Sequence, residues 1–113
     1  MIPYAIAFSF IVLDFITGIT KALATRTYSS TVMREGLFHK VALLLVMVLG
    51  LLADMAQRYL SLGVSVPVGT AICTYIVLME IGSSLENVCE INPELMPGKL
   101  AAIFGVQKKD DAN

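Results

Sequence analysis

The chain has 113 residues, of which 57% are hydrophobic and only 15% are charged, and its formal net charge is −1. This composition is typical of a membrane protein, because a soluble domain of this size would leave much of so apolar a chain facing water. The length excludes a multi-domain enzyme. Since the longest basic run is Lys108 and Lys109, the sequence also argues against nucleic acid as a partner.

Three apolar runs are long enough to cross a bilayer, at about residues 2–23, 37–56 and 66–85. Each approaches or exceeds the roughly 20 residues with which a helix spans a hydrocarbon core of about 30 Å. The polar segment 24–36 separates the first two runs, and residues 57–65, with Arg58 as their only charge, separate the second from the third. The sequence therefore predicts an all-α membrane protein with three transmembrane helices.

The residues after the third run are expected to stay outside the hydrocarbon core. Residues 93–106 mix apolar and polar side chains, are too short to cross, and are interrupted by Pro97 and Gly98. We expect them to form a short amphipathic segment at the membrane interface, followed by a polar tail, residues 107–113. The chain is accordingly divided into a single transmembrane domain, residues 1–106, and that tail.

The distribution of basic residues predicts the orientation of the chain. With three crossings, seven of the eight basic residues fall on one side, and Arg58 alone falls on the other. Because Lys and Arg concentrate on the cytoplasmic side, we expect the N-terminus outside and the C-terminus in the cytoplasm. The first run does not resemble a cleaved signal peptide, since no basic residue precedes it. The seven residues are Lys21, Arg26, Arg34, Lys40, Lys99, Lys108 and Lys109.

Several ionisable side chains are placed where lipid should exclude them. Asp14 lies near the middle of the first span, where an aspartate costs about 2.5 to 3.5 kcal/mol of insertion free energy. Such a group is expected to face other helices or water, and an acid inside a membrane marks a candidate functional site. In the third run a polar stripe follows one helical face through Cys73, Glu80, Ser84 and Asn87. The candidate pore or inter-helix polar cluster comprises Asp14, Lys21, Lys40, Glu80, Ser84 and Asn87.

The same residues also have purely structural interpretations. Lys21 and Lys40 are expected in most such proteins to act as topology anchors at the interface. For Asp14 and Glu80 the structural alternative is hydrogen bonding inside one folded bundle, although an acid inside a membrane favours a functional role. No catalytic group is assigned among them, and no cofactor or metal site is expected, because the single His39 leaves a zinc site short of ligands.

Two further features concern the contacts between helices. Asp54 and Arg58 are four residues apart near the outer end of the second span, and we expect them to form an interfacial ion pair of little energetic value. Small residues at Gly18, Ala22 and Gly50 recur at spacings that let helix backbones approach closely. They are the candidate helix-packing positions, although such spacings are common in any apolar helix.

Three motifs resemble those of bacteriophage holins of the lysis and toxin-secretion type. They are L-D-x-x-x-G-x-x-K at residues 13–21, G-L-x-x-K at residues 36–40 and S-x-L-E-N at residues 83–87. The resemblance extends over about residues 13–100. It implies a small protein that oligomerises in the bacterial cytoplasmic membrane and opens pores or lesions for host cell lysis. The partners it implies are the lipid bilayer, further copies of the chain, and an endolysin or toxin that is released.

Two other classes of membrane protein stay open. An acid in the first span of a chain near this length also resembles small proton-coupled multidrug exporters, but those usually have four tight spans and a pocket Trp, and this chain has three spans and no Trp. An accessory subunit without a pore explains the composition but gives the buried acids no purpose. No enzyme is expected, because the available bases and nucleophiles are scattered among apolar runs.

Overall fold

The computed structural model describes residues 1–92 and 94 as three long helices. They are α1 (Ile2–Ala24), α2 (Ser30–Tyr59) and α3 (Val68–Ile91). All three are long and apolar enough to cross a membrane, and the described residues contain no strand. The predicted class, a helical membrane protein with three spans, is confirmed. Apart from Glu94, the expected interfacial segment and the polar tail lie outside the described residues.

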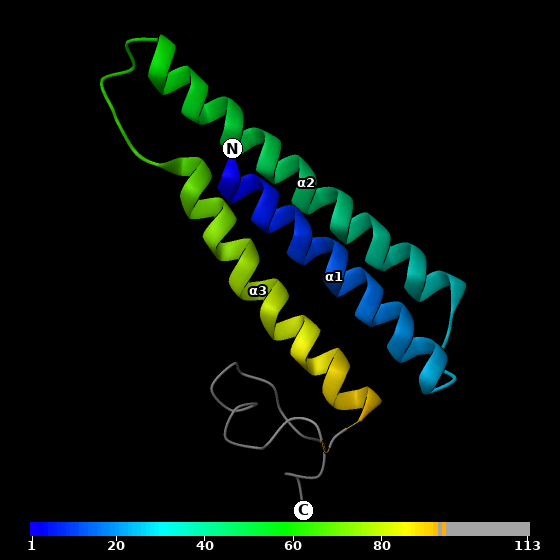
Figure 1. Ribbon diagram of the computed structural model, residues 1–113. Helices are drawn as coiled ribbons and strands as arrows, with labels where there is room; N and C mark the ends of the chain where they lie inside the picture. The colour runs from blue at the N-terminus through cyan, green and yellow to red at the C-terminus, as the bar shows by residue number, and fades with distance from the viewer. Residues whose placement is uncertain (93, 95–113) are drawn as a thin grey trace, which may run out of the picture.

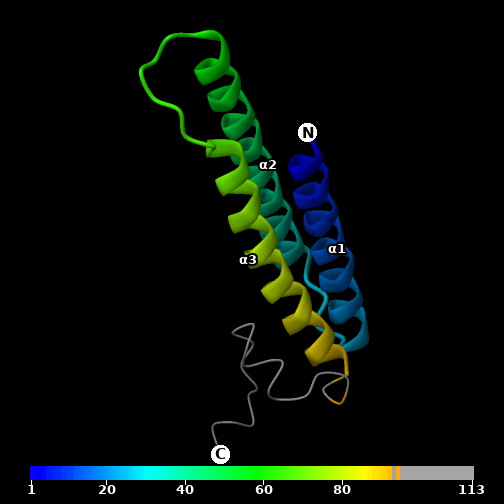
Figure 2. The same ribbon diagram turned by 60° about the vertical axis from the view of Figure 1, so that its left-hand side comes forward.

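The helices form an antiparallel bundle in which α1 and α3 run in the same direction and α2 runs in the opposite one (Figures 1 and 2). The connection between α1 and α2 lies at the same end of the bundle as the last turn of α3, and we call this the 25–29 end. The N-terminus and the connection between α2 and α3 lie at the other end, the 60–67 end. Helix α3 packs against both of its neighbours, whereas α1 and α2 contact each other little.

Helix α2 begins at Ser30, inside the segment that the sequence marked as a polar connection. Ser29 caps it, because its backbone is extended and its side chain accepts a hydrogen bond from the Val32 amide at 3.4 Å. The chain turns sharply just before, at Arg26, whose φ of 56° lies in the left-handed region. The helix therefore extends beyond the apolar run that defines its span.

The apolar core is a layer in the middle of the bundle to which each helix contributes two buried side chains. In α1 and α2 these residues lie between a polar side chain near the 60–67 end and a charged residue on the side of the 25–29 end, and in α3 they lie between a glycine and a charged residue, as described below. Large apolar side chains elsewhere on the helices are exposed, as expected where a helix faces lipid. The core residues are Ala7, Ile11, Leu43, Met47, Cys73 and Ile76.

Helices α2 and α3 approach closely where two glycines meet. A Cβ atom added to Gly50 would lie 3.2 Å from the Cα atom of Gly69 and 2.9 Å from the Cδ1 atom of Ile72. A side chain at position 50 would therefore push the two helices apart. This close approach places the start of α3 against the last turns of α2.

Candidate functional site

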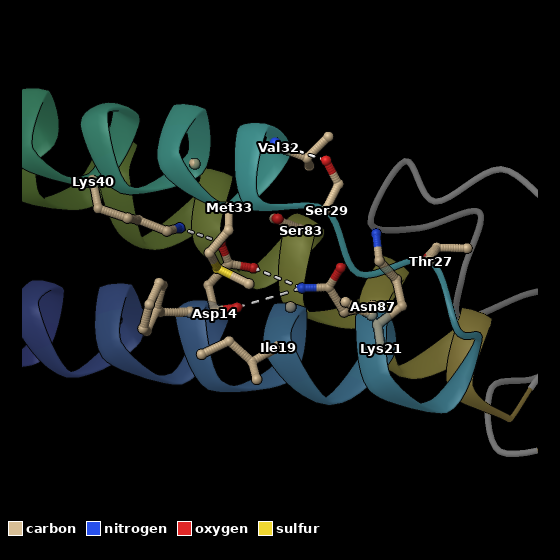
Figure 3. A pocket seen from close by; sticks show the side chains of 14 residues that line it. Asp14, Ile19, Lys21, Thr27, Ser29, Val32, Met33, Lys40, Ser83 and Asn87 are labelled. Atoms are coloured by element: carbon tan, nitrogen blue, oxygen red, sulfur yellow. Dashed lines mark hydrogen bonds and ion pairs between the residues drawn. The ribbon is translucent and has the colours of Figure 1, made fainter.

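Each helix contributes one charged side chain to a buried ion cluster, which we define as Asp14, Lys40 and Glu80. The Lys40 ammonium contacts the Asp14 carboxylate and lies 2.6 Å from Oε2 of Glu80. The three side chains are only 12% (Lys40), 8% (Asp14) and 2% (Glu80) exposed. Lys40 is thus held between two carboxyl groups that belong to the other two helices, and Figure 3 shows its side chain extending toward Asp14.

Neutral polar side chains complete the surroundings of Asp14. Asn87 donates a hydrogen bond from Nδ2 to Oδ1 of Asp14 at 3.1 Å (Figure 3). Nδ2 of Asn87 also lies 3.0 Å from Oγ1 of Thr17. Ser84 donates to the same Asp14 oxygen at 3.4 Å. Asp14 therefore accepts hydrogen bonds from α2 and from two turns of α3, which fixes the register of α1 against α3.

The cluster carries a charge imbalance. Two carboxylates and one ammonium have a net charge of −1 when all three are ionised, and no net charge when the carboxyl groups share one proton. Moving ions out of water costs several kcal/mol for each ion, and close pairing offsets that cost. Pairing with Lys40 therefore lowers the cost of keeping two carboxyl groups inside the closed bundle, and separation of the helices would expose charged groups that water or cations can solvate.

A cavity of about 430 Å³ extends from the ion cluster toward the 25–29 connection. It lies where α1 and α2 diverge, and Figure 3 shows that side chains of all three helices and the connection line it. Polar side chains line it both beside the ion cluster and near the 25–29 connection, and the other lining residues are apolar or glycine. A cavity of this size with polar lining has room for several water molecules. The polar lining residues are Asp14, Lys21, Thr27, Ser29, Lys40, Ser83 and Asn87. A cavity with polar lining thus leads from the 25–29 end to the ion cluster.

The structure brings together five of the six residues assigned to the polar cluster: Asp14, Lys40, Glu80, Ser84 and Asn87. The sixth, Lys21, lies apart. Its ammonium is 3.2 Å from Oε2 of Glu90, each side chain is about one-third exposed, and Lys21 lines the cavity nearer the 25–29 connection. The roles of these residues in a pore stay a prediction.

The candidate helix-packing residues lie inside the single chain. A Cβ atom at Gly18 would lie 3.7 Å from Nδ2 of Asn87, so this glycine faces α3. Ala22 lines the cavity, and Gly50 lies at the crossing of α2 and α3. Gly18 and Gly50 thus lie at contacts between helices of one protomer, Ala22 borders the cavity, and the role of the three in assembly stays a prediction.

The expected ion pair between Asp54 and Arg58 is wrong. Asp54 accepts a hydrogen bond from the Tyr4 hydroxyl at 3.2 Å, and the Gly69 amide donates to both of its carboxylate oxygens at 3.1 and 3.0 Å. Among the described residues no ion pair joins Asp54 to Arg58, whose guanidinium lies 6.0 Å from the centre of the Tyr59 ring. We call Tyr4, Asp54 and Gly69 the Asp54 clamp.

The clamp has a simple physical cause that sequence reasoning missed. The first amides of a helix have no partner within it, and the positive end of the helix dipole attracts a carboxylate there. Gly69 lies in the first turn of α3, and a Cβ atom at this position would overlap the Tyr4 hydroxyl and the Asp54 carboxylate. The sequence offered one signal for the clamp, a glycine directly after the start of an apolar helix. Nothing in the sequence indicated that Tyr4 of α1 would be the other partner of Asp54.

The chain was compared with protein families, curated proteins and solved structures. The model of the bacteriophage holin family matches residues 2–109, which include all three helices and both polar groups. No curated protein and no solved structure matches the chain.

Proposed function

The chain belongs to the bacteriophage holin family, and we propose that it oligomerises in the cytoplasmic membrane of the host bacterium and forms pores or lesions. Through these an endolysin or a toxin leaves the cytoplasm, which leads to host cell lysis. The protein acts in this proposal as a multi-pass membrane protein without enzymatic activity. Its partners are the lipid bilayer and further copies of itself, and the released cargo need not bind to it.

The buried ion cluster is the observation that carries this proposal. A closed protomer presents mainly apolar side chains to lipid and keeps Asp14, Lys40 and Glu80 paired with one another. A lesion needs a surface that water can wet. Separation of the helices would supply one, because the charged groups regain in water the solvation that they lose inside the bundle. The same residues thus stabilise the closed state and line the open one.

The cavity beside the cluster supports a direction for this opening. In the orientation favoured by the basic residues, the 25–29 end faces the cytoplasm. Water would then reach the cluster from the cytoplasmic side, while the apolar core and the Asp54 clamp close the remainder of the bundle. We infer that helix separation proceeds from the 25–29 end, where α1 and α2 already diverge.

The orientation can be tested by thiol labelling in intact cells. Cysteines are introduced singly at Thr27 and at Ser61, in a background in which Cys73 and Cys89 are replaced. An impermeant thiol reagent should label position 61 and leave position 27 unlabelled until the cells are permeabilised. Labelling of position 27 alone would reverse the assigned orientation.

The function can be tested by induction in a bacterium with and without a co-expressed cytosolic endolysin. We expect an abrupt collapse of the membrane potential in both strains, and a fall in turbidity only where the endolysin is present. Gradual growth inhibition without a potential collapse would contradict the proposal. Neighbouring genes would show whether the cargo is an endolysin or a toxin.

A small proton-coupled transporter is the second candidate, because the cavity reaches the carboxylate of Asp14. The variants Asp14→Asn and Asp14→Leu separate the two classes at matched membrane levels. In a holin, Asn retains a polar group in contact with Asn87 and should still assemble and kill, with altered timing, whereas Leu should fail to form a wet lesion. In a transporter the titrating proton is the mechanism, so Asn should be as inactive as Leu.

A further inference from the structure

The loop between α2 and α3, residues 60–67, exposes apolar side chains although it is not part of a lipid-facing helix. Leu60, Leu62, Val64 and Val66 occupy alternate positions, and each is more than half exposed, as is Tyr59 directly before them. The chain has no charged residue between Arg58 and Glu80. The 25–29 connection is different, because it consists of threonine, arginine, tyrosine and serine.

The backbone of this loop needs hydrogen-bond partners, whereas its exposed side chains are apolar. Residues 60–67 form neither helix nor strand, so no regular ladder of hydrogen bonds satisfies their amide groups. Contacts such as that between the Val66 amide and Oε1 of Gln57, at 2.5 Å, hold the loop against α2. Exposed irregular backbone does not occur within the hydrocarbon core, because nothing there pairs with its polar groups. The side chains therefore favour lipid, while the backbone favours water and headgroups.

The depth of the loop follows from the helix that leads into it. Arg34 and Arg58 are 24 residues apart in α2, which corresponds to about 36 Å at 1.5 Å per residue. This distance slightly exceeds a hydrocarbon core of about 30 Å, so the two guanidinium groups can reach opposite headgroup layers. Tyr59, next to Arg58, is of the aromatic type that is enriched at the membrane surface. The loop thus starts at the level of the headgroups.

We propose that residues 60–67 form a membrane-inserted loop that dips into the headgroup and upper acyl region of the nearer leaflet. Only this layer meets both requirements, since lipid chains contact Leu60, Leu62, Val64 and Val66 while water and headgroups pair with the backbone. The occupant of this apolar surface is lipid, and an uncharged loop offers no barrier to it. The inference goes beyond the proposed function, because it depends on neither lesion formation nor the orientation of the chain.

The absence of tryptophan from the chain allows a direct test. Leu62→Trp is reconstituted at a high ratio of lipid to protein in vesicles of phosphatidylcholine and phosphatidylglycerol. Its emission should be blue-shifted relative to that of Thr27→Trp, the matched control in the polar connection. Lipids brominated close to the headgroup should quench position 62 more than lipids brominated near the chain end. Aqueous iodide present on both sides of the vesicle membrane should quench position 27 several-fold more than position 62.

Two results would overturn the inference. Equal emission wavelength and equal iodide quenching at positions 62 and 27 would place the loop in water. Shielding of position 62 that disappears on dilution with further lipid would show that a second copy of the chain, and not lipid, covers the loop. Val64→Trp provides an independent reporter in the same loop, and far-UV circular dichroism verifies that each variant retains its helices.

Discussion

An aspartate joins α1, α2 and α3 on each side of the apolar core, and the two aspartates are held in different ways. Asp14 lies in the ion cluster, where it contacts the Lys40 ammonium and shares that cation with Glu80. Asp54 lies in the clamp, where a phenol and a backbone amide donate to it. The ion cluster therefore depends on a single cation, and the clamp depends on how closely two backbones approach. Substitutions that change charge should therefore weaken the ion cluster, and substitutions that change side-chain volume should weaken the clamp.

Lys40→Met should have the largest effect on the free energy of unfolding, because it removes the ammonium that pairs with two buried carboxyl groups. Removing one partner of a buried ion pair costs about 3 to 5 kcal/mol, since the other charge is left uncompensated. We expect a loss of this size in the free energy of unfolding in mixed micelles, followed by far-UV circular dichroism. In cells, the variant should accumulate poorly or collapse the membrane potential early.

A triple substitution shows whether charge causes that loss of stability. Combining Lys40→Met with Glu80→Gln and Asp14→Asn leaves no ionised group in the cluster, and most of the lost stability should return. If the triple variant is as unstable as Lys40→Met, then packing of the lysine stem, and not pairing of its charge, stabilises the cluster.

Gly69→Ala tests the clamp by adding volume without changing charge. It should have the second largest effect on the free energy of unfolding. The added methyl group would overlap the Tyr4 hydroxyl and the Asp54 carboxylate, so α1 and α2 would have to shift. Forcing extra volume into a packed site costs about 1 to 3 kcal/mol. Gly36→Ala is the matched control, because nothing lies within 4 Å of a Cβ atom there. The control should be stabilising by about 0.5 to 1 kcal/mol in a helix interior, and equal destabilisation of both variants would contradict the clamp.

The two aspartates also show what could be predicted from the sequence and what could not. The apolar runs predicted three spanning helices, and the depth of Asp14 and the stripe through Glu80, Ser84 and Asn87 predicted that these acids would face other helices. Those signals are periodic and lie within single segments. Asp54 was misassigned because its partners, Tyr4 and Gly69, belong to other helices, and Arg58 was merely the nearest opposite charge. The pairing of Lys21 with Glu90 was missed for the same reason.

Tyr4→Phe removes one donor of the clamp and retains the other. Asp54 keeps its two hydrogen bonds from the Gly69 amide, and the phenyl ring fills the same space. We expect a loss of about 0.5 to 1.5 kcal/mol, the usual net value of one hydrogen bond. Chemical denaturation in mixed micelles measures it. A loss as large as that of Lys40→Met would show that the clamp stabilises the bundle as much as the ion cluster does.

Lys21→Met should have the smallest effect on the free energy of unfolding. It tests whether the burial of Lys40, and not its charge alone, makes the ion cluster important. Lys21 also pairs with a carboxylate, that of Glu90 at 3.2 Å, but about one-third of each side chain is exposed to solvent. Water and salt screen such a pair, so its contribution is about 0 to 1 kcal/mol. The variant removes the same charge as Lys40→Met by the same substitution, so only burial and the second carboxylate distinguish the two. We expect near-native unfolding and lesion timing for Lys21→Met, measured beside Lys40→Met at matched membrane levels. Equal losses would mean that the number of cations on this side of the membrane, and not their burial between two acids, sets the stability of the bundle.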